Sequence, residues 1–499
     1  MITGISKLAV YSFSFLVLCS CANPPLAAQT QESTAQYRIR IGDNNPLVAF
    51  IEAQLPVTNG RLFMASWGAD HLPAGWATFV RNFKVSDESN HQLSFDSKPN
   101  GAWQITNGFS GRVKLSYEVD LSFTKTKWKY GNEQAGIFQD DALFVVSKAL
   151  FIVSDVRGRR HLAFDLPASW KISAPWKSSN TNPQAFIVDD NDDLINNSLV
   201  VGKYLAYTFG EGNFTLTLAL IGAMKESRTV LAPTLQKVVQ HYGRIFNRTP
   251  PRKYLMTVFY ADEADAEAFS SSAAFTEHDP LTKNNLILWG NTLAHELFHS
   301  WNGHAIQGED YASSQWFSEG FTEYFANLAL VQQGLITKDL FIRKMEKNLG
   351  AYLYFKSAPA FDGITVKQAG SKKGLYRFGV YDGGWAVAFC LDVLIRRDTQ
   401  GRKSLEDFMR LMYEKFGLTA KKYRYEDLAA TASEIAGHDV SDFFKKYVEG
   451  NEQLPVTDYL KHAGFEGYTQ FYDGEIYIFE SSSAGRQELA IRQAILTGR

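Results

Sequence analysis

The sequence predicts a multidomain α+β protein, with an N-terminal antiparallel β-sandwich domain followed by a mainly helical domain. Three observations support this prediction. Apolar and polar residues alternate with period two through much of residues 36–222. The period changes near residues 223–234, and from residue 320 onward apolar residues recur at helical spacing. A chain of 499 residues is long enough to bury the cores of two or three domains.

Residues 1–28 are expected to be an export signal and a tether rather than part of a folded domain. A basic residue precedes an apolar run at residues 8–18, which is too short for a stable transmembrane helix. Residues 18–21, Leu-Cys-Ser-Cys, resemble a bacterial lipobox in which Cys21 is the lipidated residue. We therefore expect an exported, periplasmic protein, tethered to the outer membrane only through this lipid. Ordinary signal cleavage near residues 27–28 remains the alternative.

The N-terminal β-domain is expected to span residues 30–230. Clear period-two alternation marks strands at residues 37–41, 113–119 and 214–218. Residues 143–153 form a more continuous apolar run.

The mainly helical domain is expected to span residues 231–455. Two strands, at residues 255–259 and 286–289, should precede a helix that begins near residues 290–292. Ser404 and Asp407 have the spacing of a capping box at the start of one later helix. The further helices are predicted at 320–333, 337–349, 384–397, 404–416, 425–436 and 440–448.

The last segment, residues 456–499, is expected to be a small β-hairpin extension. Asp473-Gly474 lies between two aromatic, β-branched segments and favours a tight hairpin turn. The net charge of −2 gives no indication of nucleic-acid binding. Cys390 lies inside an apolar helical pattern, so we expect a buried, inert thiol and no intrachain disulfide.

Residues 295–299 read His-Glu-Leu-Phe-His and predict a zinc site. On a helix, His295 and His299 are one turn apart and present two imidazoles to a common point. A catalytic zinc site typically holds the ion with three protein ligands and leaves a fourth position for water. Glu296 lies beside the first histidine and is the natural general base. The alternative is a buried helix that carries two histidines by chance.

A downstream helical segment offers the third zinc ligand. Glu319 and Glu323 are four residues apart and share one face of this segment. One carboxylate can bind the metal while the other orients a ligand histidine from behind. The spacing alone leaves open which of the two carboxylates takes which role. The alternative for Glu323 is a solvated helix carboxylate.

These segments resemble the gluzincin metallopeptidases, and within them the glycyl aminopeptidases more than the aminopeptidase N and leukotriene hydrolase branch. The resemblance rests on Ser300-Trp301-Asn302 after the second histidine and on residues 316–324, WFSEGFTEY. It extends over roughly residues 36–465. It implies a thermolysin-like zinc-peptidase fold for the helical domain, a peptide substrate, and Glu319 as the third ligand of one Zn²⁺ per chain. Glu323 is then the carboxylate that orients a ligand histidine. The glycyl aminopeptidases commonly continue into a PDZ domain, for which too few residues remain here.

The same resemblance assigns Tyr381 as the donor to the oxyanion that forms on the substrate carbonyl. A phenol that donates a hydrogen bond to an oxygen gaining charge is worth most when it is preorganised. Gluzincins carry Tyr-x-Lys-Gly at this turn, but Gly383 stands here in place of the lysine. The alternative for Tyr381 is a structural tyrosine in the core.

An aminopeptidase also needs an anion that binds the free amine of its substrate. The family uses a glutamate in a Gly-Gly-x-Glu-His segment, and the nearest match is Glu277-His278, with Ala273 and Ala274 near the expected glycines. Glu277 is therefore the candidate amine anchor, and a surface-loop carboxylate is the alternative. We expect an aminopeptidase for small N-terminal residues. An endopeptidase, or a catalytically weak lipid-tethered peptide-binding protein on the same scaffold, remains possible, and the sequence does not indicate an oligomeric state.

Overall fold

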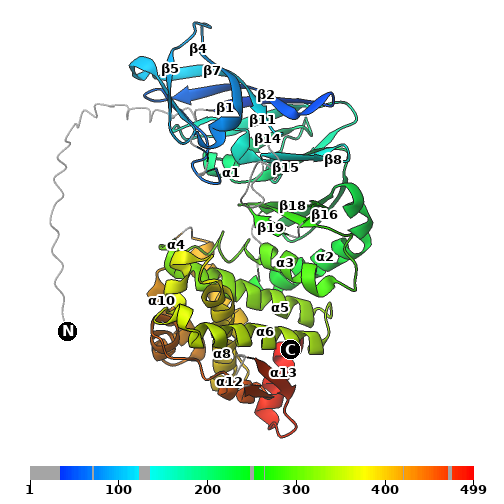
Figure 1. The fold of residues 1–499 in the computed structure, drawn as a ribbon, viewed down its shortest axis with the longest axis vertical. Helices are drawn as coiled ribbons and strands as arrows, with labels where there is room; N and C mark the ends of the chain where they lie inside the picture. Colours follow the sequence, from blue (N-terminus) through cyan, green and yellow to red (C-terminus); the bar gives the residue numbers. More distant parts are fainter. Residues whose placement is uncertain are drawn as a thin grey trace, which may run out of the picture.

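The computed structural model describes residues 34–498, apart from residues 70–71, 73, 123–134, 248–251, 263–264, 420 and 470–474. The expected export signal with Cys21 and the expected Asp473-Gly474 turn lie outside the described residues. Figure 1 shows a β-rich part at one end of an elongated molecule, a further sheet in the middle and a helical part at the other end. The expected order of a β-rich N-terminal domain and a helical C-terminal domain is confirmed.

The largest sheet has seven strands in the order β13-β14-β11-β1-β2-β7-β4. All its pairs are antiparallel except β1 with β11, which run parallel. Burial alternates strictly along β1, so one face of this sheet covers the core and the other meets solvent. The strands are β1 (Ala35–Gly42), β2 (Asn45–Val57), β4 (Val80–Asp87), β7 (Gly111–Asp120), β11 (Arg160–Asp165), β13 (Lys177–Ser178) and β14 (Ala185–Val188).

Two four-stranded sheets complete the N-terminal part. Every residue of β9 and β15 is buried, which explains the continuous apolar run in the sequence. The sheet orders are β10-β3-β6-β5 and β12-β15-β9-β8. The strands are β3 (Arg61–Phe63), β5 (Phe95–Lys98), β6 (Ala102–Ile105), β8 (Gly136–Gln139), β9 (Ala142–Val146), β10 (Val153–Ser154), β12 (Lys171–Ser173) and β15 (Ser198–Gly202).

The middle sheet has five strands in the order β16-β17-β18-β20-β19 and crosses the expected domain boundary. β17 pairs in parallel with β18, so the strands expected to close the N-terminal domain belong to the same sheet as strands that follow residue 230. The change of sheet therefore comes before Leu205 rather than at residues 223–234. The strands are β16 (Leu205–Glu211), β17 (Phe214–Leu220), β18 (Arg252–Tyr260), β19 (Asp265–Ala268) and β20 (Ser272–Glu277).

The prediction of a strand at residues 286–289 is wrong. These residues form the first turn of helix α3 (Leu286–Phe298), which begins about one turn before the expected start. The indole of Trp289 donates to Asn285 Oδ1 at 2.9 Å and to the Thr282 carbonyl at 3.0 Å, and thereby ties this turn to the preceding loop. The strand available at the open edge of the sheet is instead β19.

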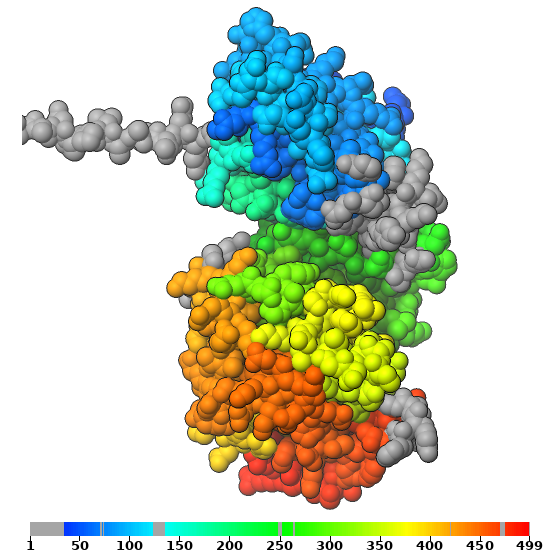
Figure 2. Space-filling model, turned by 60° about the vertical axis from the view of Figure 1, so that its left-hand side comes forward, coloured from blue at the N-terminus to red at the C-terminus, as the bar shows by residue number. Residues whose placement is uncertain are grey.

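Helices form the C-terminal half, and Figure 2 shows this half packed below the β-rich part. All six helices predicted beyond residue 320 are present, four of them continued by or preceded by short π-helical turns. The main helices are α2 (Arg228–Phe246), α5 (Thr322–Gln332), α6 (Lys338–Ser357), α8 (Gly384–Asp398), α9 (Leu405–Met412), α10 (Tyr425–Ala436), α11 (Ser441–Phe444) and α12 (Val456–His462). The π-helical turns are η5 (Trp316–Phe321), η8 (Phe378–Gly383), η9 (Tyr413–Gly417) and η10 (Lys445–Glu449).

The C-terminal extension is a hairpin followed by a helix. The hairpin of β21 (Phe465–Thr469) and β22 (Ile476–Glu480) agrees with the sequence prediction, whereas α13 (Arg486–Thr497) was not predicted. Among the described residues, Phe378–Asp398 is the helical stretch long and apolar enough to cross a membrane, but 89% of its most apolar window is buried inside the protein. It is therefore a core helix of the folded domain.

Candidate active site

Helix α3 presents the two histidines of the motif to one point. Leu293, Ala294 and Leu297 on this helix are fully buried, which anchors it in the core. His295 and His299 lie one turn apart, and the backbone N–H of His299 donates to the His295 carbonyl at 3.3 Å. Both imidazoles are about nine-tenths buried, so they face the interior of the protein rather than solvent.

Three ligand atoms converge where these imidazoles meet Glu319. His295 Nε2 lies 3.2 Å from Glu319 Oε2, His299 Nε2 lies 3.4 Å from it, and the two Nε2 atoms are 3.1 Å apart. Ligands about 2.0–2.1 Å from a tetrahedral zinc ion would lie about 3.3 Å from one another. The buried group of His295, His299 and Glu319 is therefore compatible with zinc.

The second ring nitrogen of each histidine, Nδ1, makes a hydrogen bond that orients the ring. His295 Nδ1 lies 3.1 Å from Glu323 Oε2, and His299 Nδ1 lies 2.9 Å from the Asn302 carbonyl oxygen. When Nδ1 donates to these oxygens, the Nε2 lone pair of each ring points to the centre of the site. Glu323 thus lies behind His295 and on the same helical stretch as Glu319.

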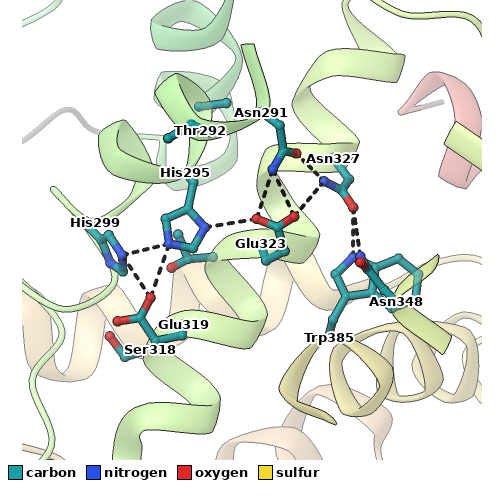
Figure 3. A network of polar contacts seen from close by, with 12 residues as sticks. Asn291, Thr292, His295, His299, Ser318, Glu319, Glu323, Asn327, Asn348 and Trp385 are labelled. Carbon is teal, nitrogen blue, oxygen red and sulfur yellow. Dashed lines mark hydrogen bonds and ion pairs between the residues drawn. The ribbon is translucent and has the colours of Figure 1, made fainter. Parts of the chain in front are cut away.

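Glu323 is itself held by a buried amide network, which Figure 3 shows. Asn291 Nδ2 donates to both carboxylate oxygens of Glu323, at 2.9 and 3.0 Å. Asn327 donates to Asn291 Oδ1 and in turn accepts from the Trp385 indole at 3.0 Å and from Asn348 at 3.3 Å. The network joins α3, α5, α6 and α8 around one carboxylate, so its orientation is set by four helices.

The carboxylates create a strongly negative field at the histidines. Burial alone would lower the pKa of His295, but hydrogen bonds with Glu319 and Glu323 outweigh it and raise that pKa to about 10. Burial alone would raise the pKa of Glu323, but the hydrogen bond and charge of His295 outweigh it and lower that pKa to about 2. The same field favours a dication at the point where the three ligand atoms meet.

Tyr381 lies on η8 beside the first histidine. Its ring centroid is 6.1 Å from that of His295, and burial together with the charge of Glu319 raises its pKa to about 12. The phenol therefore keeps its proton at neutral pH and can donate a hydrogen bond into the site.

A lysine that was not predicted from the sequence lies beside Glu319 and Tyr381. Lys373 Nζ lies 2.7 Å from Glu319 Oε1, the carboxylate oxygen that does not face the histidines, and 5.4 Å from the Tyr381 ring centroid. The lysine that gluzincins carry two residues after the tyrosine is absent here, but Lys373 places a cation between Tyr381 and Glu319.

Two close contacts fix Glu319 relative to the other groups. Asn302 Nδ2 donates to the carbonyls of Phe317 and Ser318, at 3.0 and 3.2 Å, and joins the end of α3 to the turn that carries Glu319. On the other side, Gly320 packs against Gly384 so closely that a Cβ on either glycine would overlap backbone atoms. These contacts give a physical role to Asn302 of the Ser-Trp-Asn segment and to Gly384 in the turn after Tyr381.

The site opens into a cleft of about 530 Å³. Glu296, Glu277 and Tyr381 all line this cleft together with His295. Glu277 is the last residue of β20 and not a surface-loop residue, and burial raises its pKa. The cleft also contacts Asp265 and Ala266 of β19, so the edge of the sheet beside the site is β19 rather than the expected strand at 286–289.

Sequence reasoning missed the residues that act through long-range contacts. Lys373, Asn291 and Asn327 belong to no motif, and no spacing in the sequence marks them. Lys373 and Glu319 are 54 residues apart, and Asn291 and Glu323 are 32 apart. The one available signal was the polar character of Asn291 and Asn327 on otherwise apolar helix faces.

Two family models match this chain. Residues 36–203 match the peptidase M61 N-terminal domain, and residues 289–370, which include His295, His299 and Glu319, match the M61 glycyl aminopeptidase model. The chain is a gluzincin aminopeptidase-like protein. The family match supports peptidase activity, and comparison with curated proteins gives no sequence match.

Solved structures share the fold of this gluzincin. An aminopeptidase N family protein from Idiomarina loihiensis is 18% identical with a TM-score of 0.72, over 87% of this chain and 79% of its own. An M1 zinc metallopeptidase from Deinococcus radiodurans is 13% identical with a TM-score of 0.54, over 85% of this chain and 95% of its own. A variant of that metallopeptidase has been solved with a Tyr-Ser-Ala substrate bound. At these identities the similarity shows the fold alone.

Proposed function

We propose that this gluzincin is a zinc-dependent aminopeptidase that removes small N-terminal residues from peptides. The observation that supports this best is the convergence of His295, His299 and Glu319, because His295 also lines the cleft that Glu296 and Tyr381 line. Metal-assisted amide hydrolysis requires a bound metal ion, a carboxylate base and a hydrogen-bond donor for the carbonyl oxygen. The three buried side chains, the carboxylate and the phenol can supply these functions. The preference for small residues rests on the family resemblance.

Each residue of the site has a separate role in the proposed hydrolysis. Zinc, when bound by His295, His299 and Glu319, would supply Lewis-acid polarisation of the scissile carbonyl and activation of water. Glu296 accepts a proton from the attacking water and passes it to the leaving amine nitrogen. Tyr381 donates its hydroxyl proton in a hydrogen bond to the carbonyl oxygen as that oxygen gains negative charge.

The substrate's amine is assigned to the sheet side of the cleft. Glu277 at the end of β20 lines the cleft and is half-buried, so its carboxylate can bind an ammonium group at less cost than a fully solvated residue. β19 is the last strand of this sheet and lies beside Glu277, so an extended peptide could add there as a further strand. If Glu277→Ala leaves the kinetics on free N-terminal peptides unchanged, this residue is not the amine anchor.

The test of the reaction uses Glu296→Gln. We expect this variant to retain zinc, because Glu296 is not among the ligand atoms, and to lose alanyl-amide hydrolysis by at least a hundredfold. Zinc content is measured by elemental analysis and turnover with an alanyl anilide. Full activity of the zinc-loaded variant would overturn the proposed role of Glu296.

Endopeptidase action is the second candidate, and one observation favours it. A groove of about 460 Å³ continues from the cleft, with which it shares Lys347, Ala351 and Phe378, and it reaches Ile476 of the C-terminal hairpin. A substrate could therefore extend past the reacting bond in both directions. Cleavage of an N-acetylated peptide as fast as its free counterpart would establish the endopeptidase.

We also propose that the protein is exported and held to the outer membrane through a lipid on Cys21. The support is the apolar N-terminal run and the lipobox-like residues 18–21. Replacement Cys21→Ser should abolish incorporation of labelled fatty acid and release the protein from the membrane fraction. Labelled fatty acid in the Cys21→Ser protein would contradict this assignment.

A further inference from the structure

The cleft has two walls of opposite charge. The sheet contributes Asp265 and Glu277, which we call the acidic wall. Helix α6 and the start of η8 contribute Lys344, Lys347 and Arg377, which we call the basic wall. His295, Glu296 and the rest of the α3 face lie in the same cleft. A substrate at the reacting centre can therefore reach both walls.

The basic wall is built by local geometry. Lys344 and Lys347 are three residues apart on α6, so their side chains emerge from one face of the helix. Arg377 directly precedes η8, and its guanidinium lies 5.0 Å from the ring centroid of Tyr381. The third cation is thus next to the group assigned to the substrate carbonyl.

The three cations of the basic wall form no ion pairs among the described residues. None of the three forms a salt bridge within 4.0 Å there, whereas Arg343 on the same helix pairs with Glu346 at 2.7 Å and Lys373 pairs with Glu319 at 2.7 Å. The charge of Lys344 does help to lower the pKa of Glu323, but that carboxylate already accepts hydrogen bonds from His295 and Asn291.

One further carboxyl group of the cleft, that of Asp382, interacts electrostatically with the basic wall. Asp382 lines the cleft beside Tyr381, and burial raises its pKa to about 7 although the charge of Lys347 opposes that rise. Asp382 is therefore partly protonated at neutral pH. Lys344 is partly buried, and burial lowers its pKa, so a bound anion would relieve the cost of its charge.

We propose that Lys344, Lys347 and Arg377 form a subsite for a carboxylate of the peptide substrate. This inference rests on the proposed peptidase function and specifies the substrate class of the same cleft. Two sources can supply the carboxylate: the side chain of an N-terminal aspartate, or the free C-terminus of a short peptide. Both are bound by charge-assisted hydrogen bonds from lysine and arginine.

The test compares substrates that differ only in the carboxylate. Aspartyl anilide is paired with asparaginyl anilide, and Ala-Ala-Ala is paired with its C-terminal amide. For the double variant Lys347→Gln with Arg377→Gln, we expect the ratio of kcat/KM values within at least one pair to fall about tenfold, in line with the loss of charge-assisted hydrogen bonds. Any general loss of activity affects both members of a pair and leaves the ratio unchanged.

Two further variants sharpen the test. Lys356→Gln removes a cation from the same helix that lies outside the cleft, and both ratios should stay as in the unaltered protein. Lys347→Glu should reverse the preference toward a lysyl over an aspartyl anilide, which a folding defect would not do. A fall in the anilide ratio alone identifies the side-chain source, and a fall in the tripeptide ratio alone identifies the C-terminus.

The inference is overturned if neither ratio changes in the double variant. A different result, in which the zinc-loaded protein hydrolyses none of the four substrates, contradicts the proposed function instead. The subsite is then tested by calorimetry on the whole chain, with Ala-Ala-Ala and its amide as the two probes. Equal affinity for the two, together with equal affinity for aspartyl and asparaginyl amides, would overturn the subsite as well.

Discussion

Glu323 joins the histidine motif to the rest of the helical domain. It accepts from His295 Nδ1 on one side and from Asn291 on the other, and it carries a full negative charge because these contacts lower its pKa to about 2. Glu323→Gln keeps the shape of the side chain but removes that charge. We expect zinc affinity to weaken about ten- to a hundredfold, because the partner of a ligand histidine sets both its tautomer and its basicity. Competition with a chromophoric chelator measures this change.

A matched control is Glu434→Gln, which removes an exposed carboxylate paired with Lys415 far along the chain. This variant should bind zinc as the unaltered protein does, since exposed ion pairs contribute little beyond their own surroundings. Undiminished zinc affinity in Glu323→Gln would mean that His295 is oriented by packing alone.

Single residues were predictable where a local spacing fixes their geometry. His295, His299 and the pair Glu319 and Glu323 follow from the repeat of the helix, in which residues four apart share a face. Lys373 could not be predicted in the same way, because its contact with Glu319 depends on how two segments 54 residues apart pack together. Nothing in the local sequence encodes that packing.

Two glycines hold the third-ligand turn η5 against helix α8. A Cβ on Gly384 would overlap the Trp316 carbonyl and crowd Gly320, so Gly384→Ala must push the two segments apart. Since Tyr381 precedes this contact by three residues, we expect a loss of about 1–3 kcal/mol in the free energy of unfolding. We also expect at least a tenfold loss of kcat from misplacement of the phenol.

Gly383→Ala is the control from the adjacent position. A Cβ there would meet Val366 at 3.4 Å, which is an ordinary van der Waals contact, so stability and kcat should change little. Urea unfolding and anilide turnover are measured on both variants. Equal effects at the two positions would show that the contact between Gly320 and Gly384 does not control the site.

Helices and strands could be predicted where a capping motif or a clear apolar periodicity favoured one of the two over the other. Ser404 and Asp407 form the expected reciprocal cap of α9. Residues 286–289, Leu-Ile-Leu-Trp, are apolar enough for a strand or a buried helix, and a short apolar run does not distinguish the two. The hydrogen bonds of Trp289 with Asn285 and Thr282 stabilise the helix. They depend on the preceding loop, whose sequence has no apolar periodicity that predicts its structure.

At the scale of the whole molecule, a buried polar junction connects the N-terminal sheets to the strand that ends at Glu277. Asn197 Oδ1 accepts from the Ser271 backbone at 2.7 Å, and the backbone N–H of Ser198 donates to Ser272 Oγ at 2.8 Å. β20 is therefore held from both domains. The change of sheet before Leu205 was hidden in the sequence because strands alternate alike in both sheets, and only long-range pairing assigns each strand to its sheet.

His241, a buried histidine of α2, faces the residue that follows α5. His241 Nδ1 lies 3.2 Å from Gln333 Nε2, and within the described part of the chain its buried Nε2 has no hydrogen-bond partner. Burial, with a smaller effect of Arg244, lowers the pKa of His241 to about 3. An unfolded histidine has a pKa of about 6.5, so between these two values the unfolded chain binds a proton that the folded chain does not.

The unfolding free energy should therefore fall as the pH drops below about 6.5, and His241 should contribute up to about 1.4 kcal/mol per pH unit to this fall until its folded pKa is reached. In His241→Gln, which keeps a polar group beside Gln333, that part of the slope disappears, while the exposed control His161→Gln keeps it. Urea unfolding at pH 7, 6 and 5 measures the slopes. Parallel slopes for the unaltered protein and His241→Gln would mean that His241 takes up its proton in the folded state, and the core around α2 would then have to admit water.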